Sequence, residues 1–259
     1  MRYLFWNTGK NKEINTVLSE IIIEYDISFV ILAEYEANIQ ELLTQLSLYG
    51  IHMQKYSTLG CKRITILGSV DCVKIGPQSE RYSIQVVNDD EIVCCVHLPS
   101  KLHDGTVDRR IAVHSLIDDV VELEKSLNTE KTLIVGDFNE NPYEDDFVDV
   151  EGFFGVPAYS EAKRRKKVIQ GKEFRMFYNP MWNLFGDFEE PCGTYYYNCN
   201  GTCWNMFDQV IIRPALRNRF IDKNLQIITN TMSRTLLKRN GRSDDKYSDH
   251  LPITFELED

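Results

Sequence analysis

The sequence has no long hydrophobic run. Among its 259 residues the longest apolar stretches, such as residues 29–33, fall far short of the roughly 20 residues that a membrane-spanning helix requires. The first residues, MRYLFWNTGKNKE, turn polar after six positions, which is too early for the apolar segment of a secretory signal peptide. We therefore expect a cytoplasmic protein with no membrane span.

The sequence also lacks a disulfide framework. Its seven cysteines are odd in number, and Cys94 and Cys95 are adjacent inside an apparent buried strand. Cys192, Cys199 and Cys203 cluster, but their spacing is not that of a zinc site, so small buried thiols or loop residues are the preferred interpretation. The cysteines therefore indicate a reducing compartment.

Linkers, internal repeats and low-complexity segments are absent as well. No stretch rich in Gly, Ser or Pro divides the chain, and no segment recurs at a fixed period. The composition, 43% hydrophobic and 26% charged, is that of a globular protein and excludes collagen-like, disordered and coiled-coil chains. We predict that residues 1–259 form a single domain.

Basic residues are scarce relative to acidic ones. The chain has 29 Lys and Arg against 39 Asp and Glu, a formal net charge of −10, which argues against a protein that coats nucleic acid by bulk charge. The excess is uneven, because residues 1–151 have a net charge of −13 and residues 152–259 one of +3. Segment 160–175 alone holds seven basic and two acidic residues. This asymmetry indicates either a polarised surface or two solvated faces that happen to differ.

Hydrophobic periodicity predicts alternating strands and helices, with a strand meander in the middle of the chain. Helices are expected at residues 11–25, 37–48 and 108–127. Strands are expected at residues 2–7, 28–33, 51–55, 63–68, 70–75, 82–87, 91–97, 132–135, 194–197, 207–213, 225–230 and 253–257. Two packed sheets with helices outside satisfy this order, so the sequence predicts an α/β fold.

Polar side chains stand where these strands end. They are Asn7, Glu34, His97, Asp137, Asn139, Asp208, Asp249 and His250. In layered α/β folds strand ends gather distant residues into one crevice. Hard carboxylate and amide oxygens select Mg²⁺ or Mn²⁺, and a cation offsets the repulsion among crowded acids. Two histidines can position a water or stabilise a charged phosphorus centre, so the set fits hydrolysis of a phosphate ester.

Each motif alone has a plainer interpretation. The GDFN stretch at residues 136–139 is also typical of a strand followed by a tight turn, and SDH at residues 248–250 of a helix cap or turn. A single histidine at a strand end is more often structural or exposed than a ligand. The combination of all of them at strand ends is much more specific than any one.

In this combination the sequence resembles the endonuclease/exonuclease/phosphatase superfamily. The matching segments occur in the family's order along almost the whole chain: FWN at 5–7, ILAEYE at 31–36, VHLPSK at 96–101, GDFNENP at 136–142, MFDQV at 206–210 and SDHLP at 248–252. The resemblance implies a four-layered α/β sandwich, with two mostly antiparallel sheets flanked by helices. It also implies a divalent-metal-dependent phosphoesterase.

The resemblance implies a metal site. Glu34 matches the family's principal metal ligand, and Asp249 and Asn7 match residues close to the metal. Two departures from the family pattern lie nearby. Ala33 stands where the family usually has a Gln before the glutamate, and Gln209 follows the motif aspartate where an aromatic residue is common. Neither change removes a group expected to act in catalysis, so we expect an active enzyme.

The resemblance also implies catalytic roles. Asp137 matches the residue that activates or positions the attacking water, and Asn139 an orienting residue for that water or the phosphate. His250 matches the histidine at the scissile phosphate, with Asp208 as its carboxylate partner. Such a partner fixes the tautomer of an imidazole and favours its charged form. His97 matches a second histidine found in several branches.

The substrate expected first is nucleic acid, either DNA or RNA. Segment 160–175 lies where the family varies its loops, and the aromatic residues Tyr195, Tyr196, Tyr197 and Trp204 come shortly before Asp208. Bases can stack on these aromatic residues while Lys and Arg hold the backbone. The plainer interpretation is a solvated helix face and packed strand tyrosines. Further phosphate contacts, with surface solvation as an equal alternative, are expected from Arg63, Lys101, Arg109 and Arg110. The alternative functions are hydrolysis of inositol phosphates or phospholipid headgroups, and a non-catalytic scaffold that keeps the fold.

Overall fold

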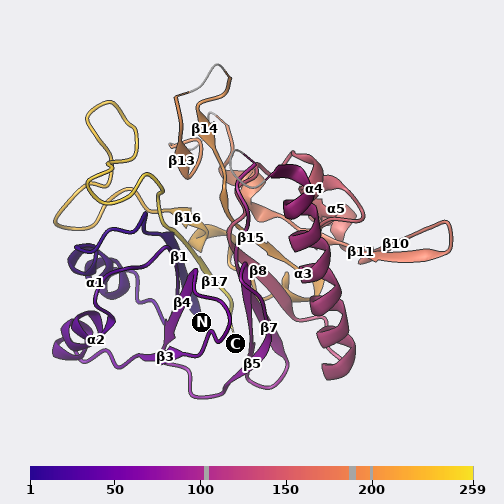
Figure 1. The fold of residues 1–259 in the computed structure, drawn as a ribbon, viewed down its shortest axis with the longest axis horizontal. Helices are drawn as coiled ribbons and strands as arrows, with labels where there is room; N and C mark the ends of the chain where they lie inside the picture. The colour runs from indigo at the N-terminus through magenta and orange to yellow at the C-terminus, as the bar shows by residue number, and fades with distance from the viewer. Residues whose placement is uncertain (102–104, 187–190, 199–200, 259) are drawn as a thin grey trace.

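Two β-sheets face each other, and helices cover their outer surfaces (Figure 1). The computed structural model describes residues 1–101, 105–186, 191–198 and 201–258. The first part of the chain supplies β1 (Arg2–Asn7), α1 (Asn15–Glu24), β2 (Phe29–Ala33), α2 (Ile39–Leu48), β3 (Gln54–Tyr56) and β4 (Ile64–Gly68). The next part supplies β5 (Val73–Gln78), β6 (Tyr82–Val87), β7 (Glu91–His97), α3 (Gly105–Leu127) and β8 (Thr132–Asp137).

Shorter elements follow. Between β8 and the hairpin near residue 200 they are α4 (Asp145–Val148), β9 (Gly155–Val156), α5 (Tyr159–Ala162), β10 (Lys166–Ile169), β11 (Lys172–Arg175), β12 (Phe177–Tyr178) and the 3₁₀ turn Pro180–Leu184. The remaining elements are β13 (Tyr195–Tyr196), β14 (Trp204–Asn205), β15 (Asp208–Ile212), 3₁₀ turns at Pro214–Leu216 and Asp222–Asn224, β16 (Gln226–Ile227) and β17 (Ile253–Glu256).

The first sheet has the strand order β16-β17-β1-β2-β4-β3. Only its β1–β2 pair is parallel, and this pair ends in register at Asn7 and Ala33. β2 is buried at every position because α1 and α2 cover its outer face, which explains why its sequence is a continuous apolar run. The outer core joins both helices to the sheet through Leu4, Trp6, Ile14, Leu18, Ile22, Val30, Leu32, Leu42 and Leu46.

The second sheet has the strand order β5-β6-β7-β8-β15-β12-β9. Its β7–β8 pair is parallel and ends in register at His97 and Asp137, and β15 begins antiparallel to β8 at Asp208. α3 packs on the outer face of this sheet through Val113, Leu116 and Val120. A third cluster, which includes Tyr3, Phe5, Phe29, Ile31, Val93, Leu133, Val135 and Val210, fills the space between the sheets.

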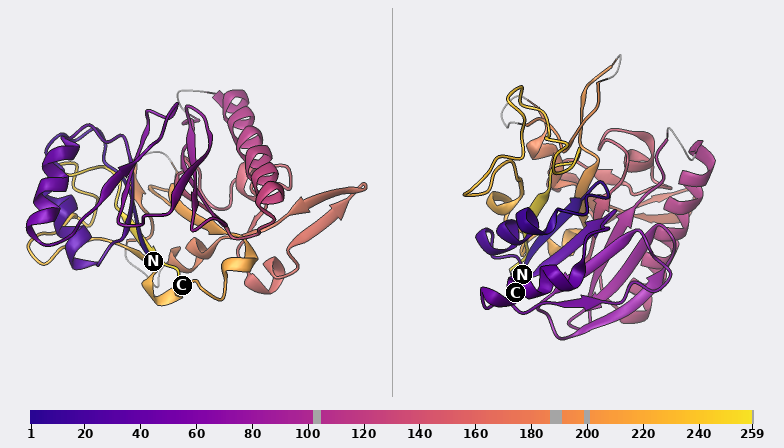
Figure 2. Two further views of the ribbon diagram at one scale, coloured as in Figure 1. Left: turned by 90° about the horizontal axis from the view of Figure 1, so that it is seen from below. Right: turned by 60° about the vertical axis from the view of Figure 1, so that its left-hand side comes forward.

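The layers run from α1 and α2 through the two sheets to α3 (Figure 2). Both sheets are mostly antiparallel, with one parallel pair in the first and two in the second. The predicted α/β sandwich of two packed sheets flanked by helices is therefore confirmed.

The basic segment 160–175 does not lie where the sequence analysis placed it. Its residues form the end of α5 and the β10–β11 hairpin, which projects away from the sandwich (Figure 1). Arg165 pairs with Glu130, just before β8, whereas Asp137 closes the same strand. The segment thus lies at the opposite end of β8 from the strand-end residues, about 16 Å along the strand. It is also a hairpin rather than a helix face.

Two further expectations concern cysteines and membrane spans. Every cysteine among the described residues has a free thiol, and Cys199 lies outside those residues. No described helix combines the length and the apolar character needed to cross a membrane.

Candidate active site

A pocket of about 640 Å³ opens where the central strands of both sheets end. The register of the sheets explains this location, since His97 and Asp208 both pair with Asp137 in neighbouring strands of the second sheet. The lining includes seven of the eight polar strand-end residues, namely Asn7, Glu34, His97, Asp137, Asn139, Asp249 and His250. The eighth, Asp208, is fully buried directly behind His250.

The backbone at the pocket takes conformations that L-residues rarely adopt. Glu34 has φ +50° and Asn139 has φ +51°, both in the left-handed region. The Glu34 peptide is held there, because its amide donates to the carbonyl of Arg63 and its carbonyl accepts from the Thr8 hydroxyl. Such strain at strand ends persists only where the surrounding structure fixes it, which is common at functional sites.

Gly136 brings the β8 strand end close to β7. A Cβ atom at this position would lie 2.0 Å from the carbonyl oxygen of Val96, its partner in the neighbouring strand. Its φ of +155° is also one that residues with a side chain rarely adopt. The glycine of the GDFN motif is therefore required so that Asp137 can stand at the pocket floor.

His250 and Asp208 form a buried pair. Nδ1 of His250 lies 2.8 Å from Oδ2 and 3.1 Å from Oδ1 of Asp208. Burial lowers the pKa of His250, but the carboxylates of Asp208, Asp137 and Asp249 outweigh it and raise that pKa to about 10. The backbone of His250 is fixed as well, because the indole N–H of Trp6 donates to the His250 carbonyl over 2.9 Å. The pair presents a charged imidazolium to the pocket.

Asp137 is the centre of the polar contacts in the pocket. Its Oδ2 accepts from Nδ2 of Asn7 over 2.8 Å and lies 3.7 Å from Nε2 of His97 and 4.0 Å from Nε2 of His250. Its Oδ1 accepts from the backbone amide of Asn139 over 2.8 Å. These contacts fix the carboxylate in one orientation between the two histidines.

His97 bridges two carboxylates. Its Nε2 lies 3.7 Å from Oε1 of Glu34 as well as 3.7 Å from Asp137. Burial lowers the pKa of His97, against the opposing effect of Asp137 and Glu34. Its Nδ1 is buried without a hydrogen-bond partner among the described residues. A neutral imidazole between two acids leaves their negative charge largely uncompensated.

The donor set fits a divalent cation. Among the described residues no Lys or Arg pairs with Glu34, Asp137 or Asp249, so three carboxylates face the pocket without a Lys or Arg to offset their charge. Asp249 is exposed and Glu34 is partly exposed, which leaves both accessible. By geometry a second set can also hold an ion, since ligand atoms of Asp137, Asp208 and His250 lie within 4.8 Å of one another. In that set, however, Asp208 and His250 already bind each other.

Not all of the predicted phosphate contacts reach the pocket. Arg63 lines it, whereas Lys101, Arg109 and Arg110 lie around a separate depression formed with α4. Tyr196 and Trp204 lie on the β13–β14 hairpin beside the pocket, without lining it. Tyr195 and Tyr197, named with them, do line it. Residues of the lining that the sequence analysis did not single out are Arg81, Leu98, Ser100, Asn205 and Phe207.

Arg109 is buried rather than available to a substrate. Only 1% of it is exposed, and it donates to Glu140 and Asp146 and to the carbonyls of Pro99 and Phe138. Its expected role as a phosphate contact is therefore wrong. Arg109 lies four residues before Val113 on α3, so helical periodicity places it on the buried stripe, a signal that the sequence already held.

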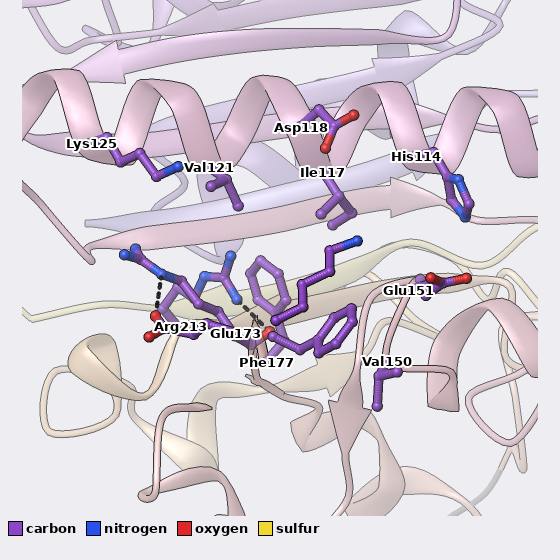
Figure 3. Close-up of a pocket in the computed structure, with 14 residues that line it drawn as sticks. His114, Ile117, Asp118, Val121, Lys125, Val150, Glu151, Glu173, Phe177 and Arg213 are labelled. Carbon is purple, nitrogen blue, oxygen red and sulfur yellow. Dashed lines mark hydrogen bonds and ion pairs between the residues drawn. The ribbon is translucent and has the colours of Figure 1, made fainter. Parts of the chain in front are cut away.

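A second pocket, of about 570 Å³, lies under α3 and contains none of the strand-end residues (Figure 3). His114, Asp118 and Lys125 of α3 face Arg213 and Phe177 across it. The Arg213 guanidinium stacks 3.8 Å above the Phe177 ring and pairs with Glu124. The buried arginine of this second pocket thus has its partners within the protein. The strand-end pocket is therefore the candidate active site.

No protein-family model matches the sequence, and no curated protein sequence matches it. Solved structures do match, over nearly their full lengths. The 3′ phosphatase NExo from Neisseria bound to product DNA hairpin is 14% identical with a TM-score of 0.60, over 100% of this chain and 99% of that one. An AP endonuclease from Archaeoglobus fulgidus is 11% identical with a TM-score of 0.59, over 99% of each chain. An endonuclease/exonuclease/phosphatase family protein from Bacteroides thetaiotaomicron is 12% identical with a TM-score of 0.60, over 99% and 97%.

These comparisons establish the fold. Over nearly its whole length the chain shares the fold of these three structures, as the order of its motifs predicted.

Proposed function

We propose that this protein is a divalent-metal-dependent phosphoesterase whose substrate is a nucleic acid, DNA or RNA. One observation carries the proposal: three carboxylates without a Lys or Arg partner meet a buried His–Asp pair in one pocket. The fold supports it, because solved structures that share it include a 3′ phosphatase with DNA product and an AP endonuclease.

Glu34 and Asp249 are the residues we assign to the metal. Both carboxylates are accessible in the pocket, and their hard oxygens suit Mg²⁺ or Mn²⁺. A bound ion supplies Lewis-acid stabilisation of charge on the phosphate oxygens. Asn7 is close to the metal site, where it donates to Asp137, while its side-chain oxygen accepts from the amide of Gly9.

Asp137 and His250 are the residues we assign to the reaction itself. Asp137, held by Asn7 and by the Asn139 amide, orients and deprotonates the water that attacks phosphorus in line. The imidazolium of His250, kept charged by Asp208, donates to a phosphate oxygen as negative charge develops there. Asn139 orients the water or the phosphate. His97 places its Nε2 beside the carboxylate of Asp137.

Aromatic side chains in the pocket favour a nucleic acid over an inositol phosphate. Tyr195 stacks on Phe207 with ring centroids 5.3 Å apart, and both line the pocket beside His250. Such rings bind the flat face of a base, whereas an inositol ring offers hydroxyl and phosphate groups instead. Arg63 on the lining supplies positive charge for the backbone.

The test is hydrolysis of single-stranded DNA, RNA, plasmid and inositol phosphates with Mg²⁺ or Mn²⁺. We expect nucleic acid to be cleaved, and His250→Ala to lower the rate on the order of 10²–10³-fold because a group that stabilises the transition state is lost. His114→Ala, an exposed histidine on α3 outside this pocket, is the matched control and keeps the wild-type rate.

Three results contradict the proposal at different points. If no substrate is hydrolysed with either metal, the assignment of an enzymatic activity is wrong. If inositol phosphates are hydrolysed and nucleic acids are not, the assignment of a nucleic-acid substrate is wrong. A wild-type rate for His250→Ala overturns the role of the histidine.

A further inference from the structure

A basic loop, residues 234–243, rises beside the β13–β14 hairpin (Figure 1), and Tyr195 and Tyr197 of this hairpin line the pocket. We infer that this loop and the hairpin together form a binding surface for an unpaired strand of nucleic acid that leads into the active site. This inference rests on the proposed function and names the form of substrate that the pocket receives.

The loop has a defined structure. Leu236 is buried in the outer core, and its amide donates to the carbonyl of Thr229. The Lys238 amide donates to the carbonyl of Arg242, which closes a turn with Gly241 in a left-handed conformation. The basic side chains are therefore carried on a fixed turn.

The turn is connected to the active site from two sides. The hydroxyl of Ser243 donates to the carbonyl of Asp249 over 2.8 Å. The Arg242 guanidinium lies 4.2 Å above the ring of Tyr196 in β13, and the neighbouring Tyr195 bridges to His250. In the right-hand view of Figure 2 the loop and strands β13 and β14 rise on the same side of the sandwich.

The charge of the turn is available to a ligand. Residues 234–243 contain four basic side chains and no acidic one. Arg234 pairs with Glu20 and Lys238 with Asp245, but no carboxylate in the described part of the chain pairs with Arg239 or Arg242. An unpaired arginine on an exposed turn, in a protein with a net charge of −10, favours a polyanionic partner.

The aromatic residues favour an unpaired strand. Tyr197 is 49% exposed, and its ring is parallel to that of Tyr195 within 7° at a centroid distance of 6.5 Å. Tyr196 presents a face that already accepts Arg242. Exposed rings beside cationic side chains stack on splayed bases, which a duplex does not offer. Tyr197 also lines the pocket, so its exposed ring lies on the path of a strand that leaves the active site.

The experiment compares KM for a single-stranded oligonucleotide, as DNA and as RNA, with KM for the blunt duplex and for bis(p-nitrophenyl) phosphate, a small diester. We expect Arg239→Ser/Arg242→Ser to raise KM for the single strand on the order of tenfold more than for the small ester. The slope of log KM against log salt concentration should fall by about 1.4, because two phosphate contacts are lost. Tyr197→Ala should reduce the preference for single strand over duplex by at least about fivefold.

Lys163→Ser/Lys167→Ser is the matched control, because it removes the same charge from the distant basic segment 160–175. It should leave all of these values at wild type. If the arginine variant behaves like this control while the small ester is still hydrolysed, the loop and the hairpin do not bind the strand, and the proposed function stands. An equal loss on duplex and single strand overturns the unpaired strand as ligand. Failure of wild type to hydrolyse the small ester or any oligonucleotide overturns the proposed function instead.

Discussion

Arg109 and Glu140 show how a buried ion pair supports the active site at the scale of single residues. The arginine donates to the Phe138 carbonyl over 2.6 Å and to Glu140 Oε2 over 2.6 Å, so it holds the turn that carries Asp137 and Asn139. Burial raises the pKa of Glu140 despite Arg109 and Lys101, which shows how strongly this carboxylate depends on its partners. The pair is a structural support rather than a substrate contact.

Arg109→Met should therefore destabilise the protein. It leaves Glu140 buried with only the half-exposed Lys101 nearby, and breaking a buried pair costs about 3–5 kcal/mol of unfolding free energy. Urea denaturation measures the loss. Arg110→Met, the exposed neighbour on the same helix, should change stability by no more than about 0.5 kcal/mol. Equal stabilities of the two variants would contradict this account.

The sequence predicted which residues meet in the pocket because of where they stand. Glu34, His97 and Asp137 each follow an apolar strand, and strand ends in layered sheets converge. It could not place Arg81, Asn205 or Phe207 in the same pocket, because their positions depend on how loops and short strands fold back over it. For Arg109 the apolar stripe of the helix indicates a buried side chain, whereas its charge alone led to the expectation of an exposed one.

At the scale of elements, β7 and β8 approach so closely at Gly136 that no side chain fits. The parallel pair is what places His97 next to Asp137 in register. Strand periodicity predicted β7 with the observed bounds, but it ended β8 at residue 135, before Gly136 and Asp137, which the structure includes in the strand. The two-residue strands β9 and β12 carry too little pattern for such a prediction, since tertiary pairing alone defines them.

Gly136→Ala should cost about 2–4 kcal/mol of unfolding free energy, because the new Cβ meets the Val96 carbonyl in addition to the strain of a positive φ. Thermal or urea unfolding measures it. Gly171→Ala, also at positive φ but with nothing within 4 Å of its Cβ, is the matched control and should cost about 1 kcal/mol. Similar losses at both sites would show that the close approach of β7 and β8 does not matter.

At the scale of the whole molecule, charge is arranged differently from its order in the sequence. The basic segment 160–175 points away from the pocket, and its pairs with Glu130 and Glu173 tie it to the far side of the sandwich and to itself. The acidic excess includes Glu34, Asp137 and Asp249, which gather at one opening. A run of charged residues in a sequence does not show which way its side chains face in the folded protein. Only the fold could therefore show which basic residues lie near the site.

The central claim, that Glu34 belongs to a metal site while Asp208 serves His250, is tested most directly by one titration. The measurement is the rate of oligonucleotide hydrolysis against Mn²⁺ concentration for wild type, Glu34→Gln and Asp208→Asn. We predict no activity in EDTA and a higher half-saturating metal concentration for Glu34→Gln. Asp208→Asn should saturate at the wild-type concentration with a rate lower on the order of 10²–10³-fold. Activity that persists in EDTA, or a shifted metal requirement in Asp208→Asn but not in Glu34→Gln, would contradict it.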